Sequence, residues 1–340
     1  MNLKRSPSGS ALTDDPRWMA AALALGARGR GRTSPNPNVG CVIVSDGYVI
    51  GRGWTQPGGR PHAEAMALAE AGEAAAGATL YTTLEPCAHV SERGPACSDL
   101  IVAAKVARVV CALGDPDART DGAGIERLRT AGIDVMTGIG AVEATRSMAG
   151  FLTRERLGHP HVTLKLALSL DGAAAMADGR SQWITGPEAR AHVHLSRSRS
   201  DAILVGLDTF LRDGTKADVR INGLEDRSPS RILLSSKRAA RYVDQVHLAG
   251  WTILSSLDDL GHLSADWLYV EGGAGVAASM LAADLVDTLH IYRAPILIGD
   301  GSKLGDIGLG DLGDAHGRWS HVDTRRLGSD TLDVYERVRG

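Results

Sequence analysis

The sequence is poor in cysteine, in long apolar runs and in excess charge of one sign. Four cysteines in 340 residues are too few for a disulfide scaffold, which favours a reducing, cytoplasmic setting where cysteines more often hold metal. No apolar run is long enough to span a membrane, and the opening MNLKRSPSGSALTDDP lacks the apolar core of a signal peptide. A net charge of −3 argues against a basic surface that follows a nucleic-acid backbone. We therefore expect a cytoplasmic protein with neither a membrane nor a nucleic-acid partner.

What is present is a chain long enough for two domains. Its 340 residues exceed the usual size of a single core. Strand-like apolar segments alternate with helical segments, a pattern typical of α/β folds with a mixed sheet covered by helices on both faces. A polar helical stretch, AVEATRSMAGFLTRERLGHP, separates two such alternations. We expect a flexible tail over residues 1–13, one domain over 14–157 and a second over 158–340.

Two helices matter for placing the chemistry. The first is expected from Asp15, with Asp14 or Asp15 as its N-cap and Pro16 in its first turn. The second is expected from Pro61 to about Ala75, and it carries the stretch RPHAEAMALAEA.

Two stretches together indicate a catalytic metal. His62 in RPHAEAMALAEA, with Cys87 and Cys97 in TLEPCAHVSERGPACSDLI, provides three ligands typical of zinc and leaves a fourth position for water. Glu64 would lie ~200° around a helix from His62, which suits a proton carrier beside that water better than a ligand. A carboxylate there can take a proton from water and return it to a leaving amine. A His-x-Glu followed by Pro-Cys and a second cysteine is the signature of zinc deaminases.

The remaining features of these stretches refine the prediction. Pro61 and Pro95 each stand where a helix would begin, so both helix N-termini would point at the metal. The positive end of the helix dipole would then favour a thiolate at Cys97. Cys41 and Cys111 lie inside apolar strand runs, and we expect them in the core.

Several motifs resemble one family. TSPNPNVGCVIV, PHAE and TLEPCAHVSERGPACSDLI closely resemble the bifunctional riboflavin-biosynthesis deaminase/reductases, and KLALSLDGAAAMADGRSQWITG and YVEGGAGVAAS resemble the reductase half of that family. The resemblance covers about residues 14 to 337 in the same order. It implies a deaminase domain of cytidine-deaminase fold, followed by a reductase domain similar to dihydrofolate reductase. The first would deaminate a pyrimidine that bears a phosphoribosylamino group, and the second would reduce its ribose with NADPH.

The same resemblance implies roles for individual residues. It implies that His62, Cys87 and Cys97 bind Zn²⁺ and that Glu64 transfers protons. In the deaminase, it implies that Asn36 binds the pyrimidine ring of the substrate and that His89 and Arg93 bind its phosphate. Hydrogen-bond donors and positive charge suit a phosphate dianion. The implied NADPH contacts are Ala167, Trp183, Thr209, Asp213, Gly273, Ala274, Gly275, Val276, Ala277, Ala278 and Ser279. The implied substrate contacts of the reductase are Ser181, Arg197, Arg220 and Glu271.

The sequence departs from the family pattern in two places. Ten positions separate Cys87 from Cys97, one more than usual, and the extra length falls at residues 90–92. The segment RDGTKADVR replaces a pattern of Asp-Asp-Pro-x-Leu-Thr-x-Arg, so that Asp213 and Arg220 remain but the intervening residues differ. Because glycine and threonine replace residues that include a proline, we expect this loop to be looser.

Three alternatives stay open from the sequence. One is an active deaminase joined to a weak or inactive reductase. Another is a nucleic-acid base deaminase, against which the acidic balance argues. A third is a zinc-stabilised binding protein that has lost catalysis, against which Glu64 argues because a structural metal site has no use for it. The oligomeric state is also open, with a homo-oligomer among the options.

Overall fold

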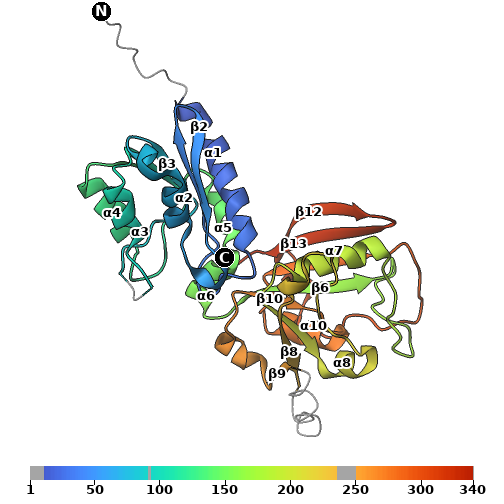
Figure 1. Ribbon diagram of the computed structural model, residues 1–340. Coiled ribbons are helices and arrows are strands. Elements are labelled where there is room, and N and C mark those ends of the chain that lie inside the picture. Colours follow the sequence, from blue (N-terminus) through green and yellow to red (C-terminus); the bar gives the residue numbers. More distant parts are fainter. Residues whose placement is uncertain (1–10, 91–92, 236–249, 340) are drawn as a thin grey trace, which may run out of the picture. The chain divides into compact units, whose positions relative to one another are not determined.

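The structure is a computed structural model that describes residues 11–90, 93–235 and 250–339. The chain divides into two compact units, Met1–Leu157 and Gly158–Gly340, each built around its own sheet (Figure 1). Both sheets are mixed and flanked by helices, which confirms the expected α/β fold class. Within the described residues, no helix combines the length and the apolar character needed to cross a bilayer.

The first unit contains a five-stranded sheet in the order β2-β1-β3-β4-β5. Strand β1 is antiparallel to β2 and β3, whereas β3, β4 and β5 are parallel. The strands are β1 (Gly40–Ser45), β2 (Tyr48–Trp54), β3 (Thr79–Thr82), β4 (Arg108–Cys111) and β5 (Asp134–Thr137). The helices are α1 (Ala11–Gly26), α2 (Ala63–Ala71), α3 (Cys97–Ala103), α4 (Ala123–Thr130), α5 (Ala141–Ser147) and α6 (Ala149–Leu157).

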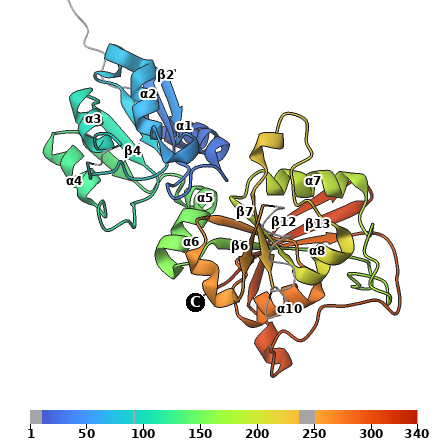
Figure 2. The same cartoon turned by 60° about the horizontal axis from the view of Figure 1, so that its bottom comes forward.

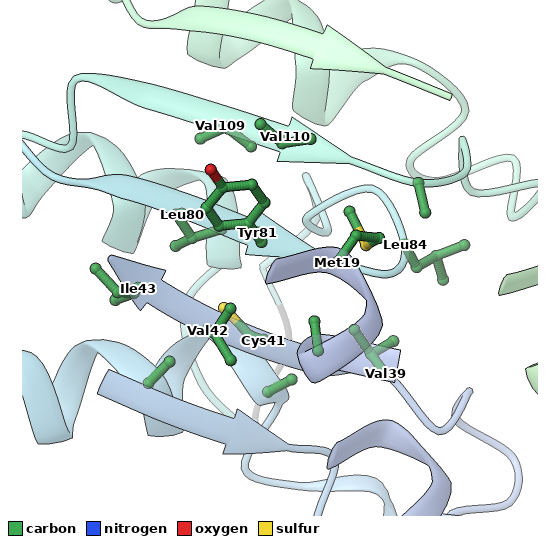
Figure 3. Close-up of a cluster of buried hydrophobic side chains, with 14 of the residues drawn as sticks. Met19, Val39, Cys41, Val42, Ile43, Leu80, Tyr81, Leu84, Val109 and Val110 are labelled. Carbon is green, nitrogen blue, oxygen red and sulfur yellow. The ribbon is translucent and has the colours of Figure 1, made fainter. Parts of the chain in front are cut away.

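Glycines let α1 and α2 approach opposite faces of this sheet. A Cβ on Gly40 of β1 would lie 1.8 Å from the carbonyl oxygen of Ala22 in α1. On the other face, a Cβ on Gly53 of β2 would lie 2.0 Å from the carbonyl oxygen of Ala63 in α2. Side chains of β1, β3 and β4 fill the space between the layers (Figure 3). The close approach holds the N-terminus of α2 against the sheet.

Helix α1 begins earlier than the sequence suggests. It starts at Ala11, so Asp15 is not its N-cap and the expected tail cannot extend to residue 13; residues 1–10 lie outside the described residues. Asp15 is buried and accepts hydrogen bonds from both terminal nitrogens of Arg108 (2.9 and 2.8 Å) and from the Tyr81 hydroxyl (2.8 Å). The Arg108 hydrogen bond is the main cause that lowers the Asp15 pKa. The carboxylate is thus committed to a partner on β4 and cannot cap the helix.

The second unit contains an eight-stranded sheet in the order β12-β13-β11-β6-β10-β7-β8-β9. Its strands are β6 (His161–Leu168), β7 (Ala202–Gly206), β8 (Ser230–Leu234), β9 (Trp251–Leu254), β10 (Trp267–Val270), β11 (Thr288–Arg293), β12 (Trp319–Leu327) and β13 (Asp330–Arg337). Its helices are α7 (Pro187–Arg197), α8 (Leu207–Asp213) and α10 (Ala274–Ala282). Helix α8 and the β12–β13 hairpin are not among the expected elements. The hairpin escapes a sequence pattern because β12 is partly exposed along its whole length.

Helices α7 and α10 cover opposite faces of the second sheet (Figure 2). Ala189 and Val193 of α7 pack with Tyr269 of β10. Ala277 of α10 packs with Val270, whose side chain points to the other face because neighbours in a strand alternate. The first residues after β10 therefore lie between two helical layers.

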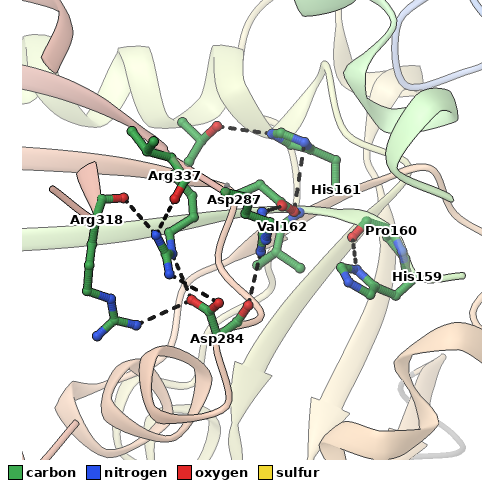
Figure 4. A network of polar contacts seen from close by, with 11 residues as sticks. His159, Pro160, His161, Val162, Asp284, Asp287, Arg318 and Arg337 are labelled. Carbon is green, nitrogen blue, oxygen red and sulfur yellow. Dashed lines mark hydrogen bonds and ion pairs between the residues drawn. The ribbon is translucent and has the colours of Figure 1, made fainter. Parts of the chain in front are cut away.

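A polar network closes the end of this sheet where β6 begins (Figure 4). Asp287 accepts the backbone N–H of Val162 at 2.7 Å. Asp284 is paired with Arg318 (3.3 Å) and Arg337 (2.8 Å), which lie just before β12 and at the end of β13. These bonds join segments far apart in the sequence and fix the start of the central strand.

The packing of α2 gives a test of the fold. We expect Gly53→Ala to lower the free energy of unfolding by about 1–3 kcal/mol or more, because its methyl group would overlap the Ala63 carbonyl. Urea unfolding of the purified protein measures this. Gly114→Ala is the control, since a Cβ there meets its nearest neighbour at an ordinary 3.7 Å. Equal stabilities for the two variants would contradict a tight α2–β2 contact.

Candidate active sites

Three side chains of the first unit meet at a site that fits a zinc ion. The Nδ1 atom of His62 lies 3.3 Å from the Cys97 Sγ and 3.6 Å from the Cys87 Sγ. The three ligand atoms lie within 4.8 Å of one another, and they form the one such group among the residues that the structure describes. Tetrahedral zinc with ordinary bond lengths places nitrogen and sulfur ligands about 3.6 Å apart. The donor types and their spacing therefore both suit zinc.

The backbone around these ligands differs from the expectation in detail. Helices α2 and α3 begin at Ala63 and Cys97, two residues after Pro61 and Pro95. His62 is the N-cap of α2 and has an extended backbone (φ −72°, ψ 162°). The rotation of ~200° assumed a helical His62, so that geometric argument is wrong.

Glu64 nevertheless lies beside the ligand cluster, in a buried position. Its Oε1 accepts a hydrogen bond from the Thr82 hydroxyl at 3.1 Å. Burial is the main cause that raises the Glu64 pKa, and the charge of His62 acts in the opposite direction. A hydrogen bond with Glu64 is also among the causes that raise the pKa of Cys97. The carboxyl group is thus placed at the metal ligands, in surroundings that stabilise its protonated form.

The two cysteines differ in acidity. The backbone N–H of Cys97 donates to the Cys87 Sγ at 3.3 Å. Hydrogen bonding to the Cys97 side chain is the main cause that lowers the Cys87 pKa to about 4, and the same bond raises the pKa of Cys97. The first N–H of α3 thus points at Cys87, whereas the expected thiolate at Cys97 stays a prediction, because a bound metal would hold both cysteines as thiolates. Cys41 and Cys111 are fully buried, which confirms their assignment to the core.

Asn36 contacts the ligand histidine directly. Its Nδ2 lies 3.2 Å from the Nε2 of His62, the ring nitrogen that faces away from the cysteines. Gly59 has a positive φ of 84°, and a Cβ there would lie 2.4 Å from the Asn36 Oδ1. Gly59 therefore leaves room for the Asn36 amide. The structure brings Asn36 into the site, where its amide can orient His62 as well as face a ligand.

His89 and Arg93 lie on the loop between the two cysteines. The Nδ1 of His89 is 3.5 Å from the Thr120 hydroxyl. Arg93 is exposed and donates to the carbonyl oxygen of Gly58 at 2.7 Å, so one end of its guanidinium is tied to the loop that precedes α2. Residues 91–92, where the extra residue falls, lie outside the described part of the chain.

Sequence reasoning missed Glu85, which holds the loop of Cys87 to α4. Its buried carboxylate accepts four backbone N–H groups, those of Asp115 (3.2 Å), Gly122 (3.1 Å), Gly124 (2.9 Å) and Ile125 (3.1 Å). The last two belong to the first turn of α4, whose N-cap is a glycine and offers no side chain. Glu85 caps that helix from a distance. The sequence signal that could have identified this residue is a glutamate directly after the strand segment YTTL.

In the second unit, the predicted residues gather at one edge of the sheet. Strand β10 lies between β6 and β7 and is parallel to both, so the three carboxyl ends are neighbours. Glu271 and Gly273 follow β10, while Thr209 and Asp213 lie in α8, which follows β7. The Gly273 N–H donates to the Thr209 hydroxyl at 3.1 Å. This edge is where open α/β sheets bind their ligands.

The predicted NADPH segment 273–279 has an outer and an inner side. Gly275 and Ser279 are exposed, and the free N–H groups of the first turn of α10 lie on the same segment. Val276 packs so closely that a Cβ on Gly206 or Gly272 would lie 2.5 or 2.4 Å from its side chain. The side chains of Ala277 and Ala278 are buried, and Ala274 is partly buried. A ligand could reach the backbone of the first turn, but not the side chains of the inner residues.

Arg197 and Glu271 form a buried ion pair. Two guanidinium nitrogens of Arg197 donate to the Glu271 carboxylate at 2.6 and 3.0 Å, and the third donates to the Asp218 carbonyl at 2.7 Å. Arg197 is 7% exposed. Its charge is therefore directed to Glu271. Arg220 differs, since its side chain is 61% exposed beside Asp218.

The altered loop after α8 is held by backbone and side-chain hydrogen bonds. Gly214 takes the left-handed conformation (φ 55°) that ends α8, and its N–H donates to the Phe210 carbonyl at 3.2 Å. Glycine is the residue preferred at such a helix end. Ala217 is buried, and its N–H donates to the Thr215 hydroxyl at 3.2 Å. Gly214 therefore suits the end of α8, whereas Ala217 takes a positive φ of 50° that is unfavourable for a residue with a side chain, and the expected loosening stays a prediction.

Three further predicted residues lie near this edge of the sheet or in a neighbouring loop. Trp183 is 65% exposed, and the guanidinium of Arg190 lies 4.8 Å from its ring centre. Ser181 is partly buried in the same loop. Ala167 lies in β6 opposite Tyr292 of β11. An exposed indole in such a loop is available to stack on a flat ligand.

Comparisons with known proteins cover both units. Residues 12–113 match the cytidine and deoxycytidylate deaminase zinc-binding region, and residues 160–332 match the RibD C-terminal domain. The riboflavin biosynthesis protein RibD of Escherichia coli strain K12 is 41% identical over 330 residues, which cover 85% of this chain and 90% of that protein. The protein of the same name from Aquifex aeolicus is 36% identical, covering 95% of this chain and 98% of that protein.

Solved structures agree with these relatives. Acinetobacter baumannii RibD superposes with a TM-score of 0.86 at 34% identity, covering 96% of this chain and 100% of that chain. A Thermotoga maritima protein described as a diaminohydroxyphosphoribosylaminopyrimidine deaminase/5-amino-6-(5-phosphoribosylamino)uracil reductase gives a TM-score of 0.85 at 29% identity, covering 96% and 99% of the two chains.

The four bonds of Glu85 give a second test. In Glu85→Gln an amide NH₂ must face two of the four N–H donors, so we expect the free energy of unfolding to fall by about 2–5 kcal/mol. Hydrogen exchange at the Gly122, Gly124 and Ile125 amides should become faster. Glu126→Gln, at an exposed position of α4, is the matched control and should change neither quantity. Unchanged exchange in Glu85→Gln would show that these bonds do not hold the loop.

Proposed function

The chain belongs to the RibD family of riboflavin-biosynthesis proteins, and on that premise we propose that its two units act in turn on one phosphorylated pyrimidine. It is a bifunctional enzyme with deaminase and reductase activities. We assign the zinc-dependent deaminase to the first unit, from α1 to Leu157, and the NADPH-dependent reductase to the second, from Gly158 onward. The observation that carries the proposal is the cluster of His62, Cys87 and Cys97 with the buried carboxyl group of Glu64 beside it.

The proposed substrate is 2,5-diamino-6-(5-phosphoribosylamino)pyrimidin-4-one. The first reaction would replace its ring amine by oxygen, using water. The second would reduce the ribosyl group of that product to a ribityl chain. Among the options considered, a small phosphorylated pyrimidine fits the acidic chain better than a nucleic-acid base does, since the composition offers no basic surface for a long phosphate backbone.

In the deaminase, His62, Cys87 and Cys97 would hold zinc. Bound zinc supplies Lewis acidity, which makes water a nucleophile near neutral pH. Asn36 would keep the His62 ring in place through Nε2, leaving Nδ1 for the metal, and would also meet the pyrimidine. His89 and Arg93 would meet the substrate phosphate from the loop between the cysteines.

Glu64 would move the proton. It takes a proton from the attacking water as the carbon–oxygen bond forms, and it gives that proton to the leaving nitrogen as the carbon–nitrogen bond breaks. Burial raises the Glu64 pKa, so the protonated form that this step requires is more accessible than for an exposed carboxylate. The metal ligands and the proton carrier then act on the same ring carbon.

In the reductase, NADPH would bind at the carboxyl ends of β6, β7 and β10. The first turn of α10 would meet its phosphates through backbone N–H groups. Thr209 would fix the turn at Gly273, while Trp183 would stack on the cofactor. Ser181, Arg220 and Glu271 would meet the substrate, with Arg197 holding the Glu271 carboxylate.

The alternative of an inactive reductase rested on a loose loop after α8. Because Gly214 ends that helix in a conformation suited to glycine, the glycine itself does not favour the alternative. We therefore propose that both units are active. Incubating the purified protein with the pyrimidine, with and without NADPH, and measuring product masses tests the proposal. Deamination alone should occur without NADPH, and the reduced product should form only with it.

Glu64→Gln tests the proton transfer. The amide cannot accept and return a proton, so we expect the deamination rate to fall by about 10²–10⁴-fold while zinc content stays at one per chain. Cys87→Ala is the contrasting variant, which should lose tightly held zinc as measured by metal analysis. Turnover near that of the wild type in Glu64→Gln would refute the assigned role, and undiminished zinc in Cys87→Ala would refute the ligand set.

Arg220 provides the test for the reductase. Loss of a charge-assisted bond to the substrate should raise the KM of reduction in Arg220→Ala by about 10–100-fold, with little change in kcat. Lys216→Ala, at an exposed position of the same loop, should leave KM unchanged. The same steady-state assay run with NADH should show poorer use of that cofactor than of NADPH. A similar KM in both alanine variants would remove Arg220 from the substrate site.

A further inference from the structure

Thr82 occupies a special position next to Glu64. It is the last residue of β3 and is fully buried. Its hydroxyl lies 3.1 Å from the Glu64 Oε1 and 3.0 Å from the carbonyl oxygen of Leu84. In the sheet, Thr82 stands between Cys41 of β1 and Cys111 of β4. The residue that bonds to the Glu64 carboxyl group is thus a threonine flanked in the sheet by two buried cysteines.

Among Thr82, Cys41 and Cys111, the Thr82 hydroxyl is the strongest hydrogen-bond donor. A threonine has one O–H to give, whereas thiols donate weakly. The Cys111 thiol donates to the carbonyl oxygen of Leu113 at 3.0 Å and is therefore occupied elsewhere. Both acceptors lie within hydrogen-bond distance of the Thr82 hydroxyl, and of the two only the Glu64 carboxyl group is a side chain that can be turned.

We propose that Thr82 is a positioning residue for deamination, whose hydroxyl fixes the Glu64 carboxyl group at Oε1 so that the transferred proton is carried on Oε2. This inference rests on the proposed function of the site. Glutamate has three rotatable side-chain bonds, and a second anchor near the end of the chain removes most of that freedom. The Thr82 hydroxyl holds Oε1 toward β3, and Oε2 is then the oxygen that takes the proton released by the attacking water. From there it passes to the leaving nitrogen, and the carboxylate returns to its starting state.

The inference predicts a loss of rate without a loss of metal. Misplacing a reacting group by about 1 Å can cost on the order of 10²-fold in rate, so we expect kcat of deamination in Thr82→Val to fall by about 10–100-fold. Valine keeps the shape and the branching at Cβ, so β3 and its packing should be preserved. KM for the pyrimidine and the zinc content should stay close to those of the wild type. Thr82→Ser keeps the hydroxyl and should restore most of kcat.

Thr83→Val is the matched control, because Thr83 is an equally buried threonine at the next position. Its hydroxyl accepts the N–H of Gly40 at 3.1 Å and lies 4.0 Å from the Met148 sulfur, so it serves the core and not Glu64. We expect Thr83→Val to lower the melting temperature while kcat per folded, zinc-loaded molecule is kept. Thermal unfolding, metal analysis and initial rates on the same samples separate the two effects.

Crystal structures of zinc-loaded Thr82→Val and Thr82→Ser give a measurement that does not depend on turnover. The Glu64 carboxyl group should be rotated in the valine variant and native in the serine variant. An unrotated carboxyl group, wild-type kcat in Thr82→Val, failure of serine to restore the rate, or zinc loss in Thr82→Val would each overturn the inference. A wild-type enzyme that does not deaminate the pyrimidine would instead refute the proposed function, and the two crystal structures would still decide the role of Thr82.

Discussion

The contact between α2 and β2 determines where deamination can take place. Because Gly51 and Gly53 have no side chains, the carbonyl groups of Ala67 and Ala63 can lie directly against the strand. This approach brings the first turn of α2 to the end of β3, where Thr82 meets Glu64 across 18 positions of the sequence. A helix held one side chain farther away would separate Glu64 from Thr82 and from the cysteines. The distances at the metal site therefore depend on backbone packing several residues away.

Three glutamates, two of them buried and one partly buried, show how partners decide what a carboxyl group does. Glu64 has one hydroxyl donor and a raised pKa, which suits a group that must gain and lose a proton. Glu85 accepts four backbone N–H groups, so its oxygens are occupied and it holds structure together. Glu271 faces Arg197, whose charge lowers the pKa of Glu271 against the effect of burial. The same residue type therefore anchors a loop, forms an ion pair and, in the proposed mechanism, transfers a proton in one chain.

The sequence was sufficient for the fold class and for the three side chains that meet at the candidate zinc site, because both depend on local patterns. His62 and Glu64 are two apart, and Cys87 and Cys97 lie in one loop, so short motifs identify them. Errors arose where the partner is distant. Asp15 was taken as a helix cap, but its partner Arg108 is 93 positions away. The motif also does not show that the backbone N–H of Cys97 points at the sulfur of Cys87.

The effect of a departure from the family pattern on a loop can be judged only when the structure of that loop is known. Between Asp213 and Arg220 the substituted residues suggested a weakened reductase, because glycine usually adds freedom to a loop. In the folded chain Gly214 ends α8 with a φ of 55°, a conformation that glycine adopts more readily than other residues. The Asp218 carbonyl in the same loop accepts a bond from Arg197 at 2.7 Å, so the loop is joined to the residue that holds Glu271. Glycine thus fits the backbone at the end of α8, and the loop leaves Arg220 exposed at the edge where the substrate is expected.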